Sequence, residues 1–309
     1  MADAVIASAV ESGFFVSGAI LGDEMNLALW LERQAVAAAD APAIMLGDQV
    51  VADYAGFYHR AASLAHGLVE RGVAPGERVA FFMKNCPEYL IAFYGVWMAG
   101  AVAVPINAKL HPKEAAWIIE DSGAGLVLVT SDPGGDLAVD CPVIDVGSAT
   151  FAQMTEGAGM SCVERTSSDL CWLFYTSGTT GRPKGVRITH GMVMAASLAY
   201  PLDVDPVTPQ DAALYAAPMS HGAGLYMSIH VRQGAAHICL ASGGYDAGEV
   251  LDLAAGHGSV SMFLAPTMVR RLLDVAKSRD VRGEGIKTIV YGGGPMYLAD
   301  ITEAVEWFG

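Results

Sequence analysis

Short apolar runs alternate along the chain with segments of helical periodicity. Residues 54–71 place apolar side chains at helical spacing behind Asp53, a residue type that caps helix N-termini. A turn rich in Gly and Pro over 72–78 separates this predicted helix from an apolar strand over 79–83. Strands that alternate with helices in this way predict an α/β fold with largely parallel sheets.

The alternation continues to the end of the chain with one interruption. Residues 132–168 are rich in Gly, Asp, Ser and Thr, and we interpret them as a connecting region with one short strand at 143–145. We therefore expect two packed α/β subdomains, over residues 1–168 and 169–309. Further helices are predicted over 88–99, 112–122, 189–200, 247–257 and 266–278 and from about 224 and 297, and further strands over 101–105, 126–130, 170–175, 186–189, 212–216, 235–240, 261–264 and 288–291.

The apolar stretch 89–106 approaches the length of a membrane span. Gly95, Gly100 and Pro105 interrupt it, and its second half has the pattern of a short buried strand. We predict a helix, a Gly turn and a strand here, and no membrane span. The first residues lack the features of a signal peptide, and the five cysteines are odd in number and widely spaced, which favours a cytoplasmic protein without a disulfide framework or a zinc site.

Composition and charge narrow the classes of function. Hydrophobic residues make up 53% of the chain and charged residues 17%, which indicates a substantial buried core and excludes a disordered protein. The net charge is −15, and the absence of Lys- and Arg-rich runs argues against a nucleic-acid binder. A phosphate ligand would therefore depend on local backbone N–H groups and a few well-placed cations.

The most informative segment is the loop Tyr175-Thr-Ser-Gly-Thr-Thr-Gly-Arg-Pro-Lys-Gly185. Glycines allow a backbone to present consecutive N–H groups to an anion, hydroxyls can donate to phosphate oxygens, and a lysine adds a point charge. The spacing differs from that of a P-loop, and a strand rather than a helix is predicted to follow. On composition alone, a solvated hairpin turn is an equally good interpretation.

The loop, unbroken over its eleven positions, resembles the phosphate-binding signature of the adenylate-forming superfamily, which includes acyl-CoA synthetases, peptide-synthetase adenylation domains and beetle luciferases. Other segments resemble that family in the same order, from about Trp30 onward. These segments are residues 72–80, 84–88 and 100–107, Pro218-Met-Ser-His-Gly222, and Tyr291-Gly-Gly-Gly-Pro-Met296.

The resemblance assigns roles to individual residues. It places His221 near the carboxylate and acyl pocket, and Ser220 stands where the family usually has an aromatic residue, which bears on the shape of that pocket. The structural alternatives are a core histidine and an ordinary strand-to-helix turn at 292–296. The implied ATP phosphate-binding residues are Thr176, Ser177, Gly178, Thr179, Thr180, Gly181 and Lys184, with Mg²⁺ held through Thr176 or Thr179, and the implied adenine-binding residues are Gly292, Gly293, Gly294 and Pro295.

The resemblance implies ATP-dependent activation of a carboxylic acid to an acyl-adenylate, followed by thioester formation with CoA. ATP, Mg²⁺ and CoA are the expected cofactors and co-substrates, and a homo-oligomer is compatible with the sequence. In the family, a Tyr-Gly-x-Thr-Glu segment, a ribose-binding aspartate and a small domain with the catalytic lysine follow the adenine loop. These 309 residues contain none of the three, so we expect the chain alone to be inactive.

Two alternative functions remain open from the sequence. One is a nucleotide-binding or scaffold fragment without catalysis. The other is an amino-acid adenylation domain, which would require an aspartate in the acid pocket; Asp203 and Asp205 lie well before Tyr291 and do not obviously serve.

Overall fold

The chain folds into two six-stranded sheets. The computed structural model describes residues 25–176 and 183–309. The first sheet has the strand order β6 (Val143–Asp145), β5 (Ala124–Val129), β3 (Arg78–Met83), β4 (Val102–Asn107), β7 (Leu170–Thr176) and β8 (Lys184–Thr189). The second has the order β12 (Ile286–Tyr291), β11 (Val260–Leu264), β9 (Ala212–Tyr215), β10 (Ala236–Cys239), β1 (Pro42–Leu46) and β2 (Gln49–Asp53).

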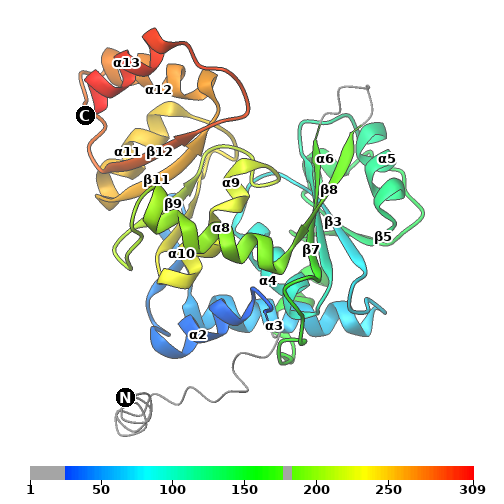
Figure 1. The fold of residues 1–309 in the computed structure, drawn as a ribbon. Helices are drawn as coiled ribbons and strands as arrows, with labels where there is room; N and C mark the ends of the chain where they lie inside the picture. Colours follow the sequence, from blue (N-terminus) through cyan, green and yellow to red (C-terminus); the bar gives the residue numbers. More distant parts are fainter. Residues whose placement is uncertain (1–24, 177–182) are drawn as a thin grey trace, which may run out of the picture.

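Both sheets are parallel except at one edge. The β7–β8 pair closes the first sheet and the β1–β2 pair closes the second, and these two pairings are antiparallel. The other neighbours pair in parallel. Figure 1 shows the two sheets side by side, each with its own covering helices. The α/β fold with largely parallel sheets is thus confirmed.

Helix α4 (Pro87–Met98) lies between the sheets and joins their cores. Every residue of this helix except Glu88 is buried. It packs on β1, β3 and β4 and on the long helix α3 (Tyr54–Glu70), so one apolar cluster contains residues from both sheets. A Cβ atom on Gly95 would lie 2.8 Å from Leu64 Cδ2, which is why α3 and α4 can pack so closely.

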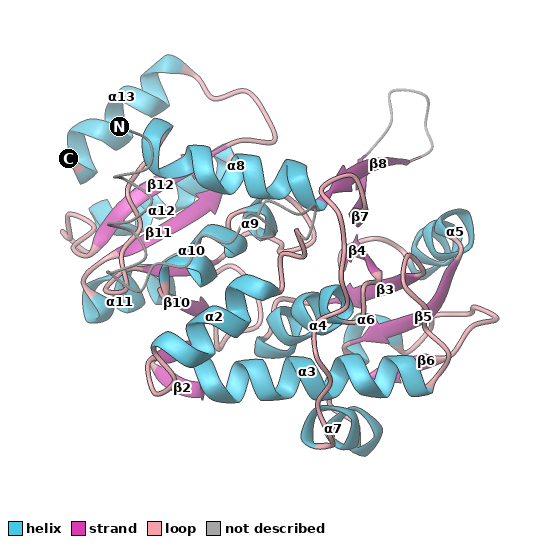
Figure 2. Cartoon of the chain, turned by 60° about the horizontal axis from the view of Figure 1, so that its bottom comes forward, coloured by secondary structure: helices cyan, strands magenta, loops and turns pink. Residues whose placement is uncertain are grey.

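Helix α5 packs on β3, β4 and β5 of the first sheet, whereas several of the remaining helices pack mainly on other helices (Figure 2). Helix α7 packs on α3, and α2 packs on α3 and α10. Helix α8 follows β8 and contacts α10, so it reaches from the first sheet to the helices of the second. These helices are α2 (Leu29–Ala37), α5 (Pro112–Ser122), α6 (Ser131–Gly134), α7 (Ala149–Glu156), α8 (His190–Asp203), α9 (Gly222–Leu225), α10 (Met227–Gln233), α11 (Ala247–His257), α12 (Pro266–Ser278) and α13 (Leu298–Phe308).

The interpretation of the apolar stretch 89–106 is confirmed. It forms most of α4, a turn at Gly100 with a φ of +72°, and most of β4. The positive φ favours glycine because it has no Cβ. Within the described ranges, no helix has the combination of length and apolar character that crossing a membrane requires.

The expected division at residue 168 does not coincide with the two sheets. Strands β7 and β8, which follow this position, belong to the first sheet, while β1 and β2 belong to the second. Parallel pairing is long-range: β1 pairs with β10, so the order of segments along the chain does not reveal which strands are neighbours. The structure also contains α2, β1, β2, α6 and α7, which the sequence pattern did not indicate.

Candidate functional site

The carboxyl ends of strands from both sheets line one cavity of about 390 Å³. Residues that follow β3, β4, β9, β10 and β11 contribute to it. The edge where parallel strands end is where open α/β sheets bind ligands. The meeting of two such edges marks this region as the candidate site.

The predicted phosphate loop joins β7 to β8. Thr176 ends β7, Lys184 begins β8, and the two residues are register partners in the antiparallel pair. The two ends of the loop therefore lie side by side at the edge of the first sheet, with a strand on each side as the sequence predicted. The other predicted phosphate-binding residues, Ser177, Gly178, Thr179, Thr180 and Gly181, lie outside the described residues.

His221 immediately precedes α9 and packs on the strand that leads to the phosphate loop. Its ring forms an edge contact with Phe174 of β7, with 5.5 Å between ring centroids. Ser220 Oγ lies 2.9 Å from His221 Nδ1, so the serine at this position hydrogen-bonds the histidine. Burial lowers the pKa of His221, which favours the neutral imidazole.

The ring of Phe263, on β11, connects the His221 segment with the predicted adenine loop. A Cβ atom on Gly222 would lie 2.6 Å from Phe263 Cζ, and one on Gly292 would lie 3.1 Å from Cε2. The two glycines thus let the backbone of both segments approach one ring. Gly293 has a φ of +82°, and a Cβ on Gly293 or Gly294 would meet no other atom within 4 Å. This loop, which continues to Pro295, is open to a flat ligand.

Asn85 holds the segment before His221. Its side-chain NH₂ donates to the carbonyls of Tyr215 at 2.9 Å and Ala217 at 2.8 Å, and its oxygen accepts from the N–H of Met219 at 2.9 Å. Asn85 follows β3 of the first sheet, whereas the segment follows β9 of the second. One amide therefore fixes the position of the His221 segment relative to the first sheet.

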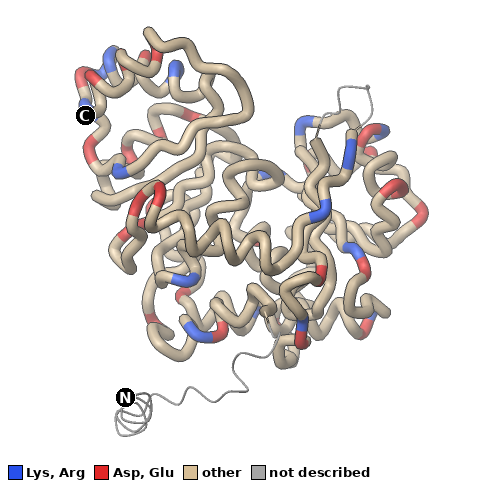
Figure 3. The backbone as a smooth tube through the Cα atoms, viewed as in Figure 1, with Lys and Arg blue, Asp and Glu red and all other residues tan. Residues whose placement is uncertain are grey.

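The cavity is cationic although the chain is acidic. Lys84, Lys109 and Arg271 line it, and no Asp or Glu is among its described lining residues. Lys84 pairs with Asp132, whereas the ion pairs of the described residues do not include Lys109 or Arg271. Charged residues elsewhere are spread over the outer helices and loops (Figure 3). A cavity whose charged lining residues are all cationic suits a phosphate-bearing ligand.

The described residues contain no group of three His, Cys, Asp or Glu side chains that could hold a metal ion. Thr176 contributes a single hydroxyl at the end of β7, and Thr179 lies outside the described residues. Magnesium binding through these threonines stays a prediction from the sequence.

Sequence reasoning missed Phe174, Phe263 and the cations of the cavity. Phe174 and Phe263 are apolar residues within apolar strands, and only their three-dimensional neighbours distinguish them from ordinary core residues. Asn85 lies in a segment that already resembled the family, so a signal existed there without indicating the hydrogen bonds that it makes.

Comparisons with known proteins show the family to which the chain is similar. Residues 31–309 match the family described as "AMP-binding enzyme". A feruloyl-CoA synthase from Amycolatopsis sp. is 30% identical over 278 residues, which cover 88% of this chain and 55% of that protein. The long-chain-fatty-acid–CoA ligase FadD13 of Mycobacterium tuberculosis is 31% identical over 266 residues, which cover 78% of this chain and 51% of that ligase. The chain thus spans about half the length of these curated relatives.

Solved structures show the same fold. The N-terminal domain of FACL13 from Mycobacterium tuberculosis has a TM-score of 0.80 at 27% identity, with 92% of this chain and 74% of that chain covered. ATP-bound MatB from Rhodopseudomonas palustris has a TM-score of 0.81 at 26% identity, with 92% of this chain and 58% of that chain covered.

Proposed function

Because this chain belongs to the AMP-binding enzyme family over residues 31–309, we propose that it supplies the nucleotide and acid sites of an ATP-dependent acyl-CoA synthetase. The observation that carries the proposal is the convergence at Phe174, His221, Phe263 and Gly292. There the strand leading to the phosphate loop, the His221 segment and the adenine loop lie against one another.

In the proposed reaction, a carboxylate oxygen of the acid attacks the α-phosphorus of ATP. The bond from that phosphorus to the bridging oxygen breaks, and pyrophosphate leaves with the bonding electrons. The transition state is mainly a problem of negative charge, which the loop N–H groups, its hydroxyls and Lys184 would stabilise. The CoA thiolate then attacks the acyl carbonyl carbon, and AMP leaves.

His221 has a positioning task in this scheme. A neutral ring, favoured by its burial, can pack against the acid and donate one hydrogen bond without forming an ion pair with the carboxylate. The Ser220 hydroxyl at 2.9 Å restrains the ring orientation. Asn85 fixes the backbone that carries both residues.

The cationic cavity is the proposed place for the phosphates of CoA. Lys109 and Arg271 line it without an acidic partner among the described residues. In a protein that joins these residues to the remaining length that the curated relatives have, called here the longer protein, Lys109→Gln and Arg271→Gln are expected to raise KM for CoA about tenfold each. The reason is that a hydrogen bond to a charged group contributes about 1.5–3 kcal/mol. KM for ATP should not change, and exposed Lys113→Gln is the matched control. An unchanged KM for CoA in both variants would remove this part of the proposal.

Acid-dependent exchange of pyrophosphate into ATP tests the first half-reaction. We expect exchange with the longer protein, loss of most of it in Lys184→Ala and His221→Ala, and none with the 309 residues alone. Failure of the longer protein to exchange with any acid of a broad panel would refute the acyl-activating function.

An amino-acid substrate is less well supported by Asp203 and Asp205, the two acidic residues considered from the sequence. Asp205 accepts a hydrogen bond from Thr288 Oγ1 at 2.8 Å and lies 3.3 Å from Lys287 Nζ, so its carboxylate is already engaged. Asp203 is exposed at the end of α8. Neither is placed to hold a substrate ammonium, which favours an acid without an α-amino group.

A further inference from the structure

A small void with several polar side chains in its wall lies next to the His221 segment. Its volume is about 10 Å³, close to the smallest cavity that holds one water molecule. Tyr200 of α8, Tyr226, His230 of α10, and Ser261 and Phe263 of β11 line it, together with apolar residues. No carboxylate is among the described residues that line the void.

His230 presents an unpaired acceptor. Its side chain is buried, and Nδ1 lies 2.8 Å from the carbonyl oxygen of Tyr226. Because a carbonyl only accepts hydrogen bonds, Nδ1 must carry the hydrogen. Burial lowers the pKa of the ring and keeps it neutral, so Nε2 is left with a free lone pair. Nε2 is buried and has no hydrogen-bond partner among the described residues.

Ser261 adds a second unpaired polar group to the void. Its Oγ is buried without a hydrogen bond of standard geometry, although the Tyr200 hydroxyl lies nearby. Buried polar atoms nearly always have a hydrogen-bond partner, and leaving one unpaired is unfavourable. Two such atoms around one void of this size indicate that a small hydrogen-bonding group belongs there.

The void shares a wall with the proposed acid site. Phe263 lines the void and also contacts Gly222, the residue after His221. The ring of Tyr226 stacks on Phe263, with centroids 6.0 Å apart and planes 23° apart. Phe263 and Tyr226 therefore form the boundary between the void and the segment that carries His221, so the far end of an acid bound at His221 would meet the void at these two rings.

We propose that this void is a subsite for a hydroxyl group at the far end of the acid, which makes a hydroxylated carboxylic acid the preferred substrate class. The hydroxyl donates to His230 Nε2 and accepts from Ser261 Oγ. A carbonyl or carboxylate would set lone pair against lone pair at Nε2, and an ammonium would lack a counter-charge. This inference rests on the proposed function, because it concerns the same acid site.

Matched pairs of acids test the subsite by binding. Calorimetry on the longer protein that contains this chain would compare 4-hydroxybutanoate with butanoate, and 4-hydroxybenzoate with benzoate. We expect the hydroxy acid of at least one pair to bind at least tenfold more tightly, because a site that hydrogen-bonds a hydroxyl discriminates strongly against the analogue that lacks it. The pair that responds identifies an alkyl or an aryl body.

Variants then locate the source of the discrimination. His230→Leu removes the acceptor and should bring the affinity ratio close to one while the unsubstituted acid keeps its affinity. Ser261→Ala, the milder change, should reduce the ratio several-fold. Ser228→Ala is the control: Ser228 is buried on the same helix as His230 with an unpaired hydroxyl, but it does not line the void.

The outcomes separate this inference from the proposed function. Equal binding within both pairs, no binding of either hydroxy acid, or a ratio that survives both His230→Leu and Ser261→Ala overturns the subsite. If hydroxy acids bind selectively but pyrophosphate exchange is absent, the subsite stands and the acyl-activating function falls. If pyrophosphate exchange proceeds with hydroxylated and unsubstituted acids at equal kcat/KM, the acyl-activating function stands and the subsite falls.

Discussion

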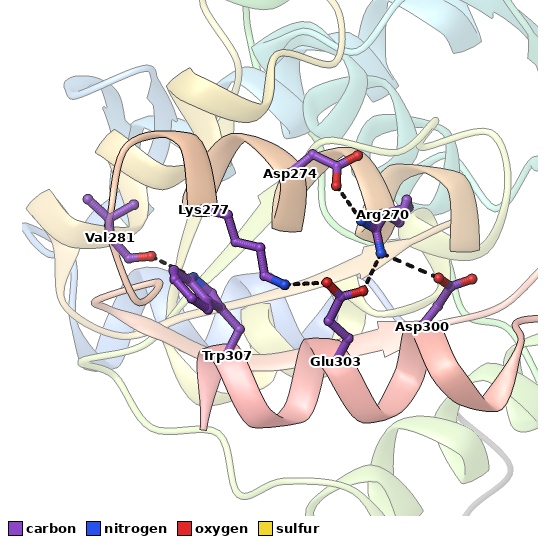
Figure 4. Close-up of polar contacts among 7 residues, drawn as sticks. All are labelled: Arg270, Asp274, Lys277, Val281, Asp300, Glu303 and Trp307. Carbon is purple, nitrogen blue, oxygen red and sulfur yellow. Dashed lines mark hydrogen bonds and ion pairs between the residues drawn. The ribbon is translucent and has the colours of Figure 1, made fainter.

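Helices α4 and α13 are held in place by different forces. In α4 every residue except Glu88 is buried, and its aromatic rings pack in edge and tilted pairs against one another and against Phe81 and Trp172 of the first sheet. In α13 only Ala304 is buried. Figure 4 shows how α13 is instead joined to α12 by charge: Arg270 pairs with Asp300 and Glu303, and Lys277 pairs with Glu303.

Apolar side chains around α13 remain accessible. Leu298 is 77% exposed and Val305 is 62% exposed, and a cavity of about 260 Å³ lies between β12 and α13. The difference affects the two halves of the candidate site. The His221 segment is fixed by packing against the α4 core. The adenine loop instead joins β12 to a helix that a few half-buried apolar side chains and ion pairs hold together.

The largest effect is expected from the packed helix. Trp97 is fully buried, packs on Phe93 and Tyr94, and donates from Nε1 to the carbonyl of Cys171 at 2.9 Å. Trp97→Ala should lower the free energy of unfolding by about 3–5 kcal/mol, measured by urea denaturation. Val305→Ala on α13 is the counterpart, with a loss within about 0.5 kcal/mol. Similar losses in both variants would contradict the comparison.

Acid should destabilise the packed region through His190. Leu27 N–H donates to Nδ1 at 3.2 Å, and burial lowers the pKa of His190 to about 4. The unfolded chain takes up the proton first, near pH 6.5, so stability falls as the pH drops from 6.5 towards 4. The loss is about 3 kcal/mol from this group alone.

Unfolding curves at several pH values isolate the contribution of His190. His190→Asn keeps an acceptor for Leu27 and should flatten the pH dependence in this window. If His190→Asn retains the full slope, another group is responsible.

Asn85→Ala should separate positioning from stability. The variant loses three hydrogen bonds, and we expect a loss of about 2 kcal/mol in the free energy of unfolding. If the side chain positions His221, kcat/KM for the acid falls in the longer protein at temperatures where the variant remains folded. Asn85→Asp keeps only the acceptor for Met219 and should be intermediate. An unaltered kcat/KM would show a role in folding alone.

The smallest effect is expected from Glu303, and it should be local. Hydrogen bonds from Lys277, the larger cause, and from Arg270 lower the pKa of Glu303. The stabilisation from these ion pairs is therefore present above about pH 4.5 and is lost as the pH falls through the lowered pKa. Glu303→Gln should increase amide hydrogen exchange over 298–308 with little change in the free energy of global unfolding. High salt screens the ion pairs and should increase the exchange over the same residues. Exposed Glu306→Gln is the control, and equal exchange in the two variants would argue against the ion pairs.

Local signals explain which elements the sequence could predict. Residues 112–122 begin with Pro112 and a capping box between His111 and Glu114, and end at Gly123 with a φ of +63°, so both ends could be read from residue types. Helices α11 and α12 likewise have their expected bounds. Helix α7 was missed because its eight residues lie within a Gly- and Ser-rich segment.

The site could be predicted only in part, for a different reason. The glycines and hydroxyls of the phosphate loop, His221 and the adenine loop have residue types that indicate ligand contact, supported by resemblance. Phe263, His230 and Ser261 have residue types that are common in a protein core. Only their neighbours in the folded chain indicate ligand contact. No periodicity distinguishes a buried histidine with a free Nε2 from one whose hydrogen bonds are complete.

Both sheets consist of parallel strands with one antiparallel pair at an edge. In the amino-acid sequence this pair comes last in one sheet and first in the other. In the first sheet β7 and β8 follow the parallel strands, whereas in the second β1 and β2 precede them. During synthesis the first sheet can therefore be complete once residue 189 has left the ribosome, while β1 must wait for β10 at 236–239. The edge of β1 that pairs with β10 is thus the strand edge that remains unpaired for the longest part of synthesis.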